Sequence, residues 1–488
     1  MRTTAILILV FSGFLAKNLF SEKASFLERF QDDPKAASWE PPHKTYKYGR
    51  DEQDFSKFKN QRQLPNINFK AGYKRNDDIA NFVIEGEIIK NLTEMESYQL
   101  ASGRVSERPW SDDYWALAKG GLGARYSDPE FTNHFEFKEL YDYYKENPSP
   151  LLWDEKRIDM MSPSEKYDLL FSSQNFPLTE YSWKSGLQYY YKYGEVESWM
   201  GICHGWAIAS YNLKRPKKAV TVKAFDGVTD IKFYPSDIKA LASLLYANVR
   251  TPTLFIGGRC NSKEPKIDEE NGRVIEDECY DNNPASFHMA LVNEIGIRKR
   301  SFIMDATYDY EVWNQPVIEY SYQYFNPKTQ EETDKLEIAE VAIDSFENDV
   351  YQNYRSEKAK YVVGVVADVI YALESTPSHR ETDGEHNDNE ANVRYYYDLE
   401  LNANREIIGG EWYQMMHPDF LWTNVKNSKA ESIADSYLGS YNDWNIKDSI
   451  PLRWKQYSIT ASNKGQPMAK VLDKLIEESR KNNDVAEN

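Results

Sequence analysis

The stretch that decides the fold is SWMGICHGWAIASYNL, residues 198–213. After the cysteine, apolar residues recur at Trp206, Ala209 and Leu213, which is the spacing of a buried helix. The pattern predicts that Cys203 lies in the first turn of this helix. Backbone N–H groups at a helix N-terminus stabilise a thiolate, lower its pKa and can bind an oxyanion. Cys203 is therefore a candidate nucleophile, against the alternative of a buried structural cysteine.

The sequence around this helix, from about 106 to 335, mixes helical and strand-like segments. AVTVKAF (219–225) and TPTLFIGG (251–258) are typical of strands. SDIKALASLLYANV (236–249) has apolar residues at helical spacing, with Ser236 as the expected cap. Helices and strands mixed in this way predict an α+β catalytic core.

The segment before this core, residues 22–105, is polar and interrupted by prolines. It contains one strand-like piece, NFVIEGEIIKNL (81–92). We expect an extended arm or a small leading domain here.

The segment after the core, residues 336–488, has a β-rich pattern. YVVGVVADVIYAL (361–373) predicts a strand, and YYYDLELNANREIIGGEW (395–412) predicts a hairpin around an Asn-rich turn. MAKVLDKLIEESRKN (468–482) has an apolar stripe at helical spacing. The expected C-terminal region is therefore β-rich and ends in a helix.

The N-terminus has the pattern of a secretory signal peptide. Residues 1–21 place one arginine before an apolar run from Ala5 to Leu15 and then become polar. The run is shorter than the roughly 20 apolar residues that span a membrane, and no other segment approaches that length. We expect cleavage of residues 1–21 and a secreted or periplasmic protein without a transmembrane segment; a retained N-terminal anchor is the alternative.

Composition excludes one class of partner. The 488 residues include 59 Lys and Arg against 77 Asp and Glu, which gives a net charge of -18. This charge repels phosphate backbones, so we expect no nucleic-acid partner.

The chain has three cysteines, and an odd number cannot all pair. Cys260 and Cys279 lie 19 positions apart across an acidic turn. A bridge between them would stabilise the fold by roughly 3 kcal/mol in the chain-entropy model. It would leave Cys203 as the free thiol.

A thiolate nucleophile needs an imidazole, and His288 is the leading candidate among seven histidines. It lies in SFHMALVNEIG (286–296), an apolar run that we interpret as a strand. RSFIMD (300–305) is interpreted as the next strand, so that Asp305 would lie beside His288 and orient it. Asp309 is the alternative carboxylate.

His417 is the rival base, because His-Pro-Asp at 417–419 holds an imidazole and a carboxylate close together. A structural turn is the commoner meaning of such a tripeptide.

Six segments resemble the transglutaminase elicitor family, known from oomycete plant pathogens and found in bacteria. They occur in the same order and together cover roughly residues 105 to 425. The segments are PWSDDYW (109–115), MGICHGWAIAS (200–210), GGRCNS (257–262), NPASFHMALVNEIG (283–296), FIMDATYDYEVWNQPV (302–317) and IIGGEWYQMMHPDFLW (407–422).

The resemblance implies a papain-like, transglutaminase-like core and a protein-glutamine γ-glutamyltransferase activity. It implies Cys203 as nucleophile, His288 as general base and acid, Asp305 as the orienting carboxylate, and a Cys260–Cys279 disulfide. The oxyanion would bind the Cys203 backbone N–H and the indole N–H of Trp199, the closest indole before the cysteine. The substrates implied are proteins with glutamine and lysine side chains.

No cofactor is required by this chemistry. Related transglutaminases often respond to calcium, so the resemblance leaves a weak calcium site open. The acidic turn at 266–278 lacks the ordered spacing of an EF-hand, and no metal ligand is assigned. Two other functions compete: a cysteine protease or glutamine deamidase with the same triad, and a non-catalytic surface or recognition protein built on the same scaffold.

Overall fold

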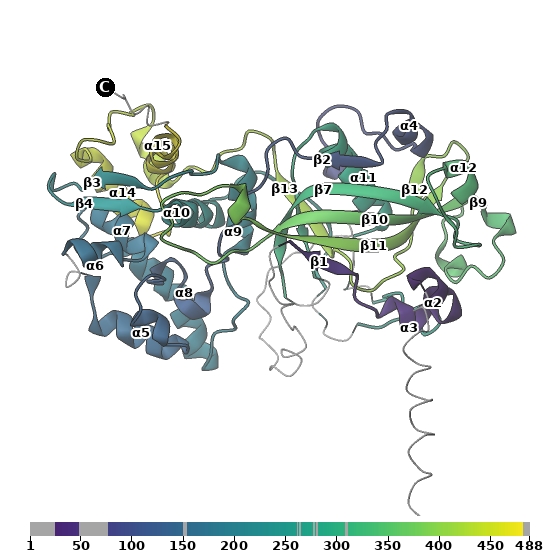
Figure 1. Cartoon of the computed structure of the whole chain (residues 1–488), viewed down its shortest axis with the longest axis horizontal. Coiled ribbons are helices and arrows are strands. Elements are labelled where there is room, and N and C mark those ends of the chain that lie inside the picture. The colour runs from purple at the N-terminus through teal and green to yellow at the C-terminus, as the bar shows by residue number, and fades with distance from the viewer. Residues whose placement is uncertain are drawn as a thin grey trace, which may run out of the picture.

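The computed structural model, shown in Figure 1, describes residues 25–47, 77–149, 154–260, 262, 265–276, 279, 282–307 and 311–481. The predicted signal peptide and Asp309 lie outside these residues. The described chain combines helices with antiparallel strands, so the α+β prediction is confirmed. Within the described part, no helix is both long and apolar enough to cross a membrane.

The helix that carries Cys203 is α9 (Cys203–Asn212), and it begins at the cysteine, as predicted. It packs closely against α10 (Pro235–Asn248) at Gly205, where only a glycine fits. A Cβ there would lie 2.1 Å from the Ser243 carbonyl oxygen. The other face of α9 is fixed by the Trp206 indole, which donates to the Trp110 carbonyl oxygen at 2.9 Å. The close contact at Gly205 on one face and the Trp206 hydrogen bond on the other hold α9 rigidly in the core.

One large antiparallel sheet faces this helix. Its strand order is β1-β11-β10-β7-β6-β13-β5, and β7 has neighbours along its whole length. The ordered strands are β1 (Lys44–Tyr46), β11 (Asn389–Leu401), β10 (Tyr361–Leu373), β7 (Asn314–Phe325), β6 (Ile303–Asp305), β13 (Phe420–Asn424) and β5 (Thr253–Gly257). Short strands β2 (Ser102–Arg104), β8 (Glu332–Thr333), β9 (Val341–Ala342) and β12 (Ile407–Gly409) pair at its margins, and β3 (Val220–Lys223) and β4 (Asp230–Phe233) form a separate pair.

Figure 1 shows most helices gathered on one side of the molecule and the large sheet on the other, with α9 between them. One hydrophobic cluster, from Ile79 to Ile476, includes side chains from both sides, and two further clusters surround Phe30 and Trp183. The helices on the same side of the molecule as α10 include α5 (Phe137–Glu146), α6 (Glu155–Asp159), α7 (Pro163–Leu170), α8 (Pro177–Tyr193), α14 (Leu452–Ser462) and α15 (Ala469–Ser479), of which α7 and α15 contact α10. The remaining α-helices are α2 (Phe26–Asp32), α3 (Pro34–Ser38), α4 (Leu92–Ser97), α11 (Pro284–Ala290), α12 (Leu336–Ala339) and α13 (Ile433–Leu438).

Several predicted elements are confirmed. The strand predicted at 361–373 is β10, and the hairpin predicted at 395–412 is formed by β11 and β12. The C-terminal stripe is α15, which buries Val471, Leu472, Leu475 and Ile476. The apolar stripe of α15 has a period of 3.6 residues, and β10 is a long apolar run rich in valine, so the two sequences predict a helix and a buried strand.

Three local predictions are wrong. The segment around His288 is not a strand: it forms α11 and then a π-helix, Leu291–Ile297, because Asn283 caps the helix and Pro284 occupies its first turn. Residues 82–91 form no strand, and Asn91 instead caps α4. The cap of α10 is Tyr234 with Asp237, not Ser236.

Candidate functional site

The thiol of Cys203 is enclosed at the start of α9. The residue is 6% exposed and is not part of a disulfide. Its Sγ accepts a hydrogen bond from Asn314 Nδ2 at 3.4 Å and lies 3.7 Å from the Val312 carbonyl oxygen. The start of β7 therefore meets the N-terminus of α9 at the sulfur atom.

The orientation of the Asn314 amide is fixed from its other side. Trp422, on β13, donates from its indole Nε1 to Asn314 Oδ1 at 2.7 Å. An indole N–H can only donate, so the amide oxygen must face Trp422 and the NH₂ group must face the sulfur. Asn314 therefore supplies a directed hydrogen-bond donor to Cys203.

Asp305 lies next to this contact. It is the last residue of β6, and the β6–β7 register places it opposite Asn314. Its Oδ1 accepts from the Trp313 backbone N–H at 2.9 Å and from the Thr307 hydroxyl at 3.2 Å. Its Oδ2 is buried without a hydrogen-bond partner among the described residues. Burial raises the pKa of Asp305 to about 8 despite these donors, so the carboxyl is largely protonated at neutral pH.

His288 lies among aromatic side chains of the same sheet. Its Nδ1 is 2.9 Å from the Tyr397 hydroxyl oxygen, and its ring lies 4.7 Å from the Tyr322 ring. Burial lowers its pKa to about 3, so the imidazole is neutral at neutral pH. Its Nε2 is buried and has no hydrogen-bond partner in the described part of the chain.

The three predicted triad residues are therefore not joined by hydrogen bonds in the structure. Cys203 and Asp305 both flank Asn314, at the first residue of β7. His288 instead contacts Tyr322, eight residues further along that strand.

The pKa of Cys203 departs from the expectation for a helix N-terminus. Burial raises it to about 11, the Asn314 side chain and backbone N–H lower it, and the nearby Glu374 and Asp305 carboxyls raise it. Loss of solvation thus outweighs the two Asn314 donors, and the thiol is protonated at neutral pH in this arrangement.

Alkylation should report this protonated thiol. Iodoacetamide should modify Cys203 slowly at pH 7, and the rate should rise about tenfold per pH unit up to pH 10, because only the thiolate reacts. Mass spectrometry of the peptide that contains Cys203 gives the rate at each pH. The same protein in denaturant is the control, and its rate should level off near pH 9. A level rate above pH 8 in the folded protein would contradict a raised thiol pKa.

Trp199, expected to bind the oxyanion, donates its indole Nε1 to the Glu197 carboxylate. In this arrangement that N–H points to a carboxylate rather than to the thiol. The residue that sequence reasoning missed is Asn314, although it lies within the VWNQPV part of a segment quoted above. Asn314 could have been found by predicting a hairpin between the strands now seen as β6 and β7. The register of that hairpin places Asn314 opposite Asp305.

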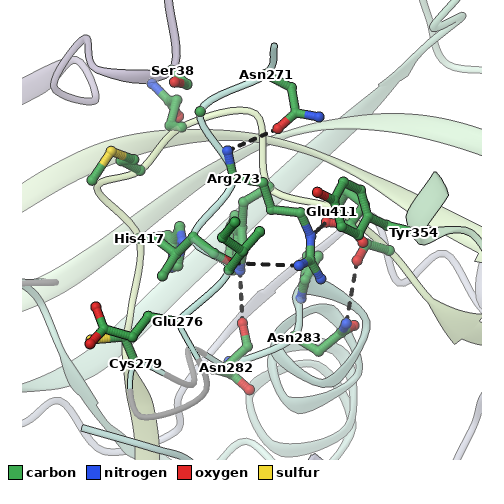
Figure 2. Close-up of a pocket in the computed structure, with 18 of the residues that line it drawn as sticks. Ser38, Asn271, Arg273, Glu276, Cys279, Asn282, Asn283, Tyr354, Glu411 and His417 are labelled. Atoms are coloured by element: carbon green, nitrogen blue, oxygen red, sulfur yellow. Dashed lines mark hydrogen bonds and ion pairs between the residues drawn. The ribbon is translucent and has the colours of Figure 1, made fainter. Parts of the chain in front are cut away.

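Cys260 and Cys279 form the expected disulfide. Cys279 lines a cavity of about 230 Å³, shown in Figure 2, together with His417, Trp412, Arg273 and Glu411. The rings of His417 and Trp412 stack with centroids 4.7 Å apart. Burial lowers the pKa of His417 to about 3, so both candidate bases, His288 and His417, are neutral imidazoles.

Across the described residues, no group of three or more His, Cys, Asp or Glu side chains has the arrangement of a metal site.

Comparison with known proteins identifies the family. Among solved structures, the chain is similar to the crystal structure of the GP42 transglutaminase from Phytophthora sojae, with a TM-score of 0.48 and 22% identity, covering 71% of this chain and 89% of that chain. No curated protein matches the sequence. The family model described as transglutaminase elicitor matches residues 84–449, which include Cys203, His288 and Asp305. The chain therefore belongs to the transglutaminase elicitor family.

Proposed function

We propose that this protein is a transglutaminase-type acyltransferase in which Cys203 is the nucleophile. The observation that carries the proposal is the free thiol at the N-terminus of α9, hydrogen-bonded by an amide that Trp422 holds in one orientation. Residues that fix a reacting atom in this way are typical of an active site. A cysteine at the start of a buried helix that faces a sheet also fits a papain-like core, which we propose for residues 106–335.

The proposed reaction has two steps. His288 takes the proton from the Cys203 thiol, and the sulfur bonds to the carboxamide carbon of a glutamine side chain. The C–N bond then breaks, and ammonia leaves with the proton that His288 gives up. A lysine amine then attacks the thioester, the C–S bond breaks, and His288 accepts the amine proton and returns a proton to the sulfur. The product is an isopeptide bond between two proteins.

His288 is proposed as the base because one of its ring nitrogens is unused. Nδ1 is bonded to the Tyr397 hydroxyl, while Nε2 has no partner among the described residues. Asp305 Oδ2 also has no partner among the described residues, and a catalytic role is one explanation for a buried polar atom without a partner. In the proposed reactive arrangement, His288 Nε2 meets the thiol, and Nδ1 exchanges the Tyr397 hydroxyl for the ionised Asp305 carboxylate, which then stabilises the imidazolium that forms.

The Cys203 backbone N–H, at the first position of α9, is proposed as an oxyanion donor. Trp199 would join it only after leaving Glu197. Secretion belongs to the same proposal, since a disulfide forms and persists in an oxidising compartment.

Amine incorporation tests the function. The mature protein, incubated with dimethylcasein and a fluorescent cadaverine, should attach the amine covalently to the casein. Release of ammonia without amine attachment would assign a deamidase instead, and cleavage of the casein would assign a protease. An absence of all three reactions, with and without added calcium, would overturn the proposal and favour a non-catalytic recognition protein.

The same assay separates the two candidate bases. His288→Ala should lose amine incorporation, because no other imidazole in the proposal carries the proton. His417→Ala should retain the chemical step, and any loss should follow from lower stability. The opposite result would transfer the role of base to His417.

A further inference from the structure

Asn314 directs two N–H donors at the sulfur of Cys203. Its side-chain Nδ2 lies 3.4 Å from Sγ, and its backbone N–H also helps to lower the pKa of the thiol. The side chain is buried, and the Trp422 indole donates to its amide oxygen at 2.7 Å, so the NH₂ group is kept toward the sulfur. These donors are therefore in place before any substrate binds.

The sulfur atom is a weak acceptor for such a donor. An oxyanion instead forms charge-assisted hydrogen bonds, which are about twice as strong as neutral ones. When the carbon of an acyl group bonds to Sγ, its oxygen lies two bonds from the sulfur and gains the negative charge. An amide that exchanges a weak bond to sulfur for a strong bond to this oxygen stabilises the transition state more than the ground state. Such a difference is what accelerates a reaction.

The tryptophans nearest in sequence to Cys203 and Asn314 already use their indole N–H groups. Trp199 donates to the Glu197 carboxyl group, and Trp313 donates to Glu311 Oε2 at 3.0 Å. Each indole would have to leave a strong acceptor before it could bind an oxyanion. The Asn314 amide would leave only the sulfur, so it is the better placed donor.

We propose that Asn314 is a catalytic residue whose side-chain N–H binds the oxyanion, together with the Cys203 backbone N–H. Ile202, the residue before Cys203, has no side-chain group that caps α9, so no cap competes for the first N–H groups of the helix. The S–C bond forms while His288 holds the thiol proton, and the electron pair of the C=O bond moves to the oxygen, which accepts from Asn314. When the C–N bond breaks, that pair returns to the carbon and the amide again donates to the sulfur.

The inference rests on the proposed acyl transfer, and two reactions of the Cys203 thiolate separate an oxyanion donor from a group that only changes the acidity of the thiol. p-Nitrophenyl acetate acylates a thiolate through an oxyanion and releases p-nitrophenolate, whereas iodoacetamide alkylates it at a saturated carbon without one. Both rates are proportional to the fraction of thiolate, so this fraction cancels from their ratio at a fixed pH. Single-turnover rates of the full mature chain, corrected for the background of Cys203→Ala, give the ratio.

Asn314→Ala should lower the ratio of acylation to alkylation by about 100-fold or more, which is the usual loss for an oxyanion donor. Trp422→Phe keeps the amide but lets it turn its oxygen toward the acyl group, so it should lower the ratio at least about threefold. Tyr211→Phe is the matched control, because it removes a hydroxyl that lies 3.0 Å from Thr423 Oγ1, next to Trp422 in β13. The ratio in this control should stay within about twofold of wild type.

Circular dichroism establishes that the variants are folded, and Trp422→Phe decides the question if Asn314→Ala is not. Equal slowing of acylation and alkylation would overturn the inference and leave Asn314 with an effect on thiol acidity alone. No acylation of the wild type above the Cys203→Ala background would overturn it as well. A wild type whose acylation depends on Asn314 but that incorporates no amine contradicts only the proposed function. Amine incorporation by the wild type, with an unchanged ratio in Asn314→Ala, contradicts only the inference.

Discussion

Cys203→Ser should reduce amine incorporation by at least about 10⁴-fold, because a serine hydroxyl in this environment is a far weaker nucleophile than a thiolate. The hydroxyl can still accept from the Asn314 amide, which lies 3.4 Å from the sulfur in the wild type. The melting temperature should therefore shift by no more than about 2 °C. The two measurements together separate a chemical defect from a folding defect.

Ser210→Ala is the matched control for this substitution. Ser210 lies on the same helix, is buried, and its hydroxyl donates only to the Ala207 carbonyl oxygen within that helix. Removing it should leave amine incorporation within about twofold of wild type, since small buried changes away from a site mainly affect stability. Activity of the Cys203→Ser protein close to that of this control would show that Cys203 is not the nucleophile.

The start of α9 could be predicted from sequence because it depends on local signals. The apolar period after Cys203 is that of a buried helix, and the structure begins the helix at that residue. The segment around His288 has no such clear period, since an apolar run of this length fits a buried strand or a buried helix equally well. The Asn-Pro pair before it, Asn283 and Pro284, was the better guide, because both residues favour the start of a helix.

The surroundings of the thiol could not be predicted from local patterns. Asn314 and Trp422 are 108 positions apart, and their hydrogen bond exists only because β6 lies between β7 and β13 in the sheet. The direction of the Cys203 pKa shift depends on the same tertiary contacts. The Asn314 donors favour the thiolate, but the depth of burial, which only the folded chain determines, has the larger effect on the pKa.

Asp305→Asn should lower amine incorporation by up to about 10⁴-fold, by analogy with triads in which an amide favours the wrong imidazole tautomer. The Asn oxygen can still accept from the Trp313 backbone N–H, so the local structure should persist. Asp309→Asn, at the rival carboxylate, should change the rate little. If Asp309→Asn has the larger effect at matched stability, the orienting carboxylate is Asp309.

The stability of Asp305→Asn should depend on pH in a direction that the structure determines. Asp305 has a folded-state pKa of about 8, whereas its unfolded value is about 3.9, so the folded protein binds the extra proton between these values. A raised pKa of this kind contributes stability at low pH that is lost as pH rises through 8. The wild type should therefore lose up to about 1.4 kcal/mol per pH unit relative to the Asn variant, which does not titrate. Melting curves of both proteins at pH 5, 6, 7 and 8 measure this difference. A gap that stays constant across the series would show that Asp305 is ionised in the folded protein, and the carboxylate would then be charged before any substrate binds.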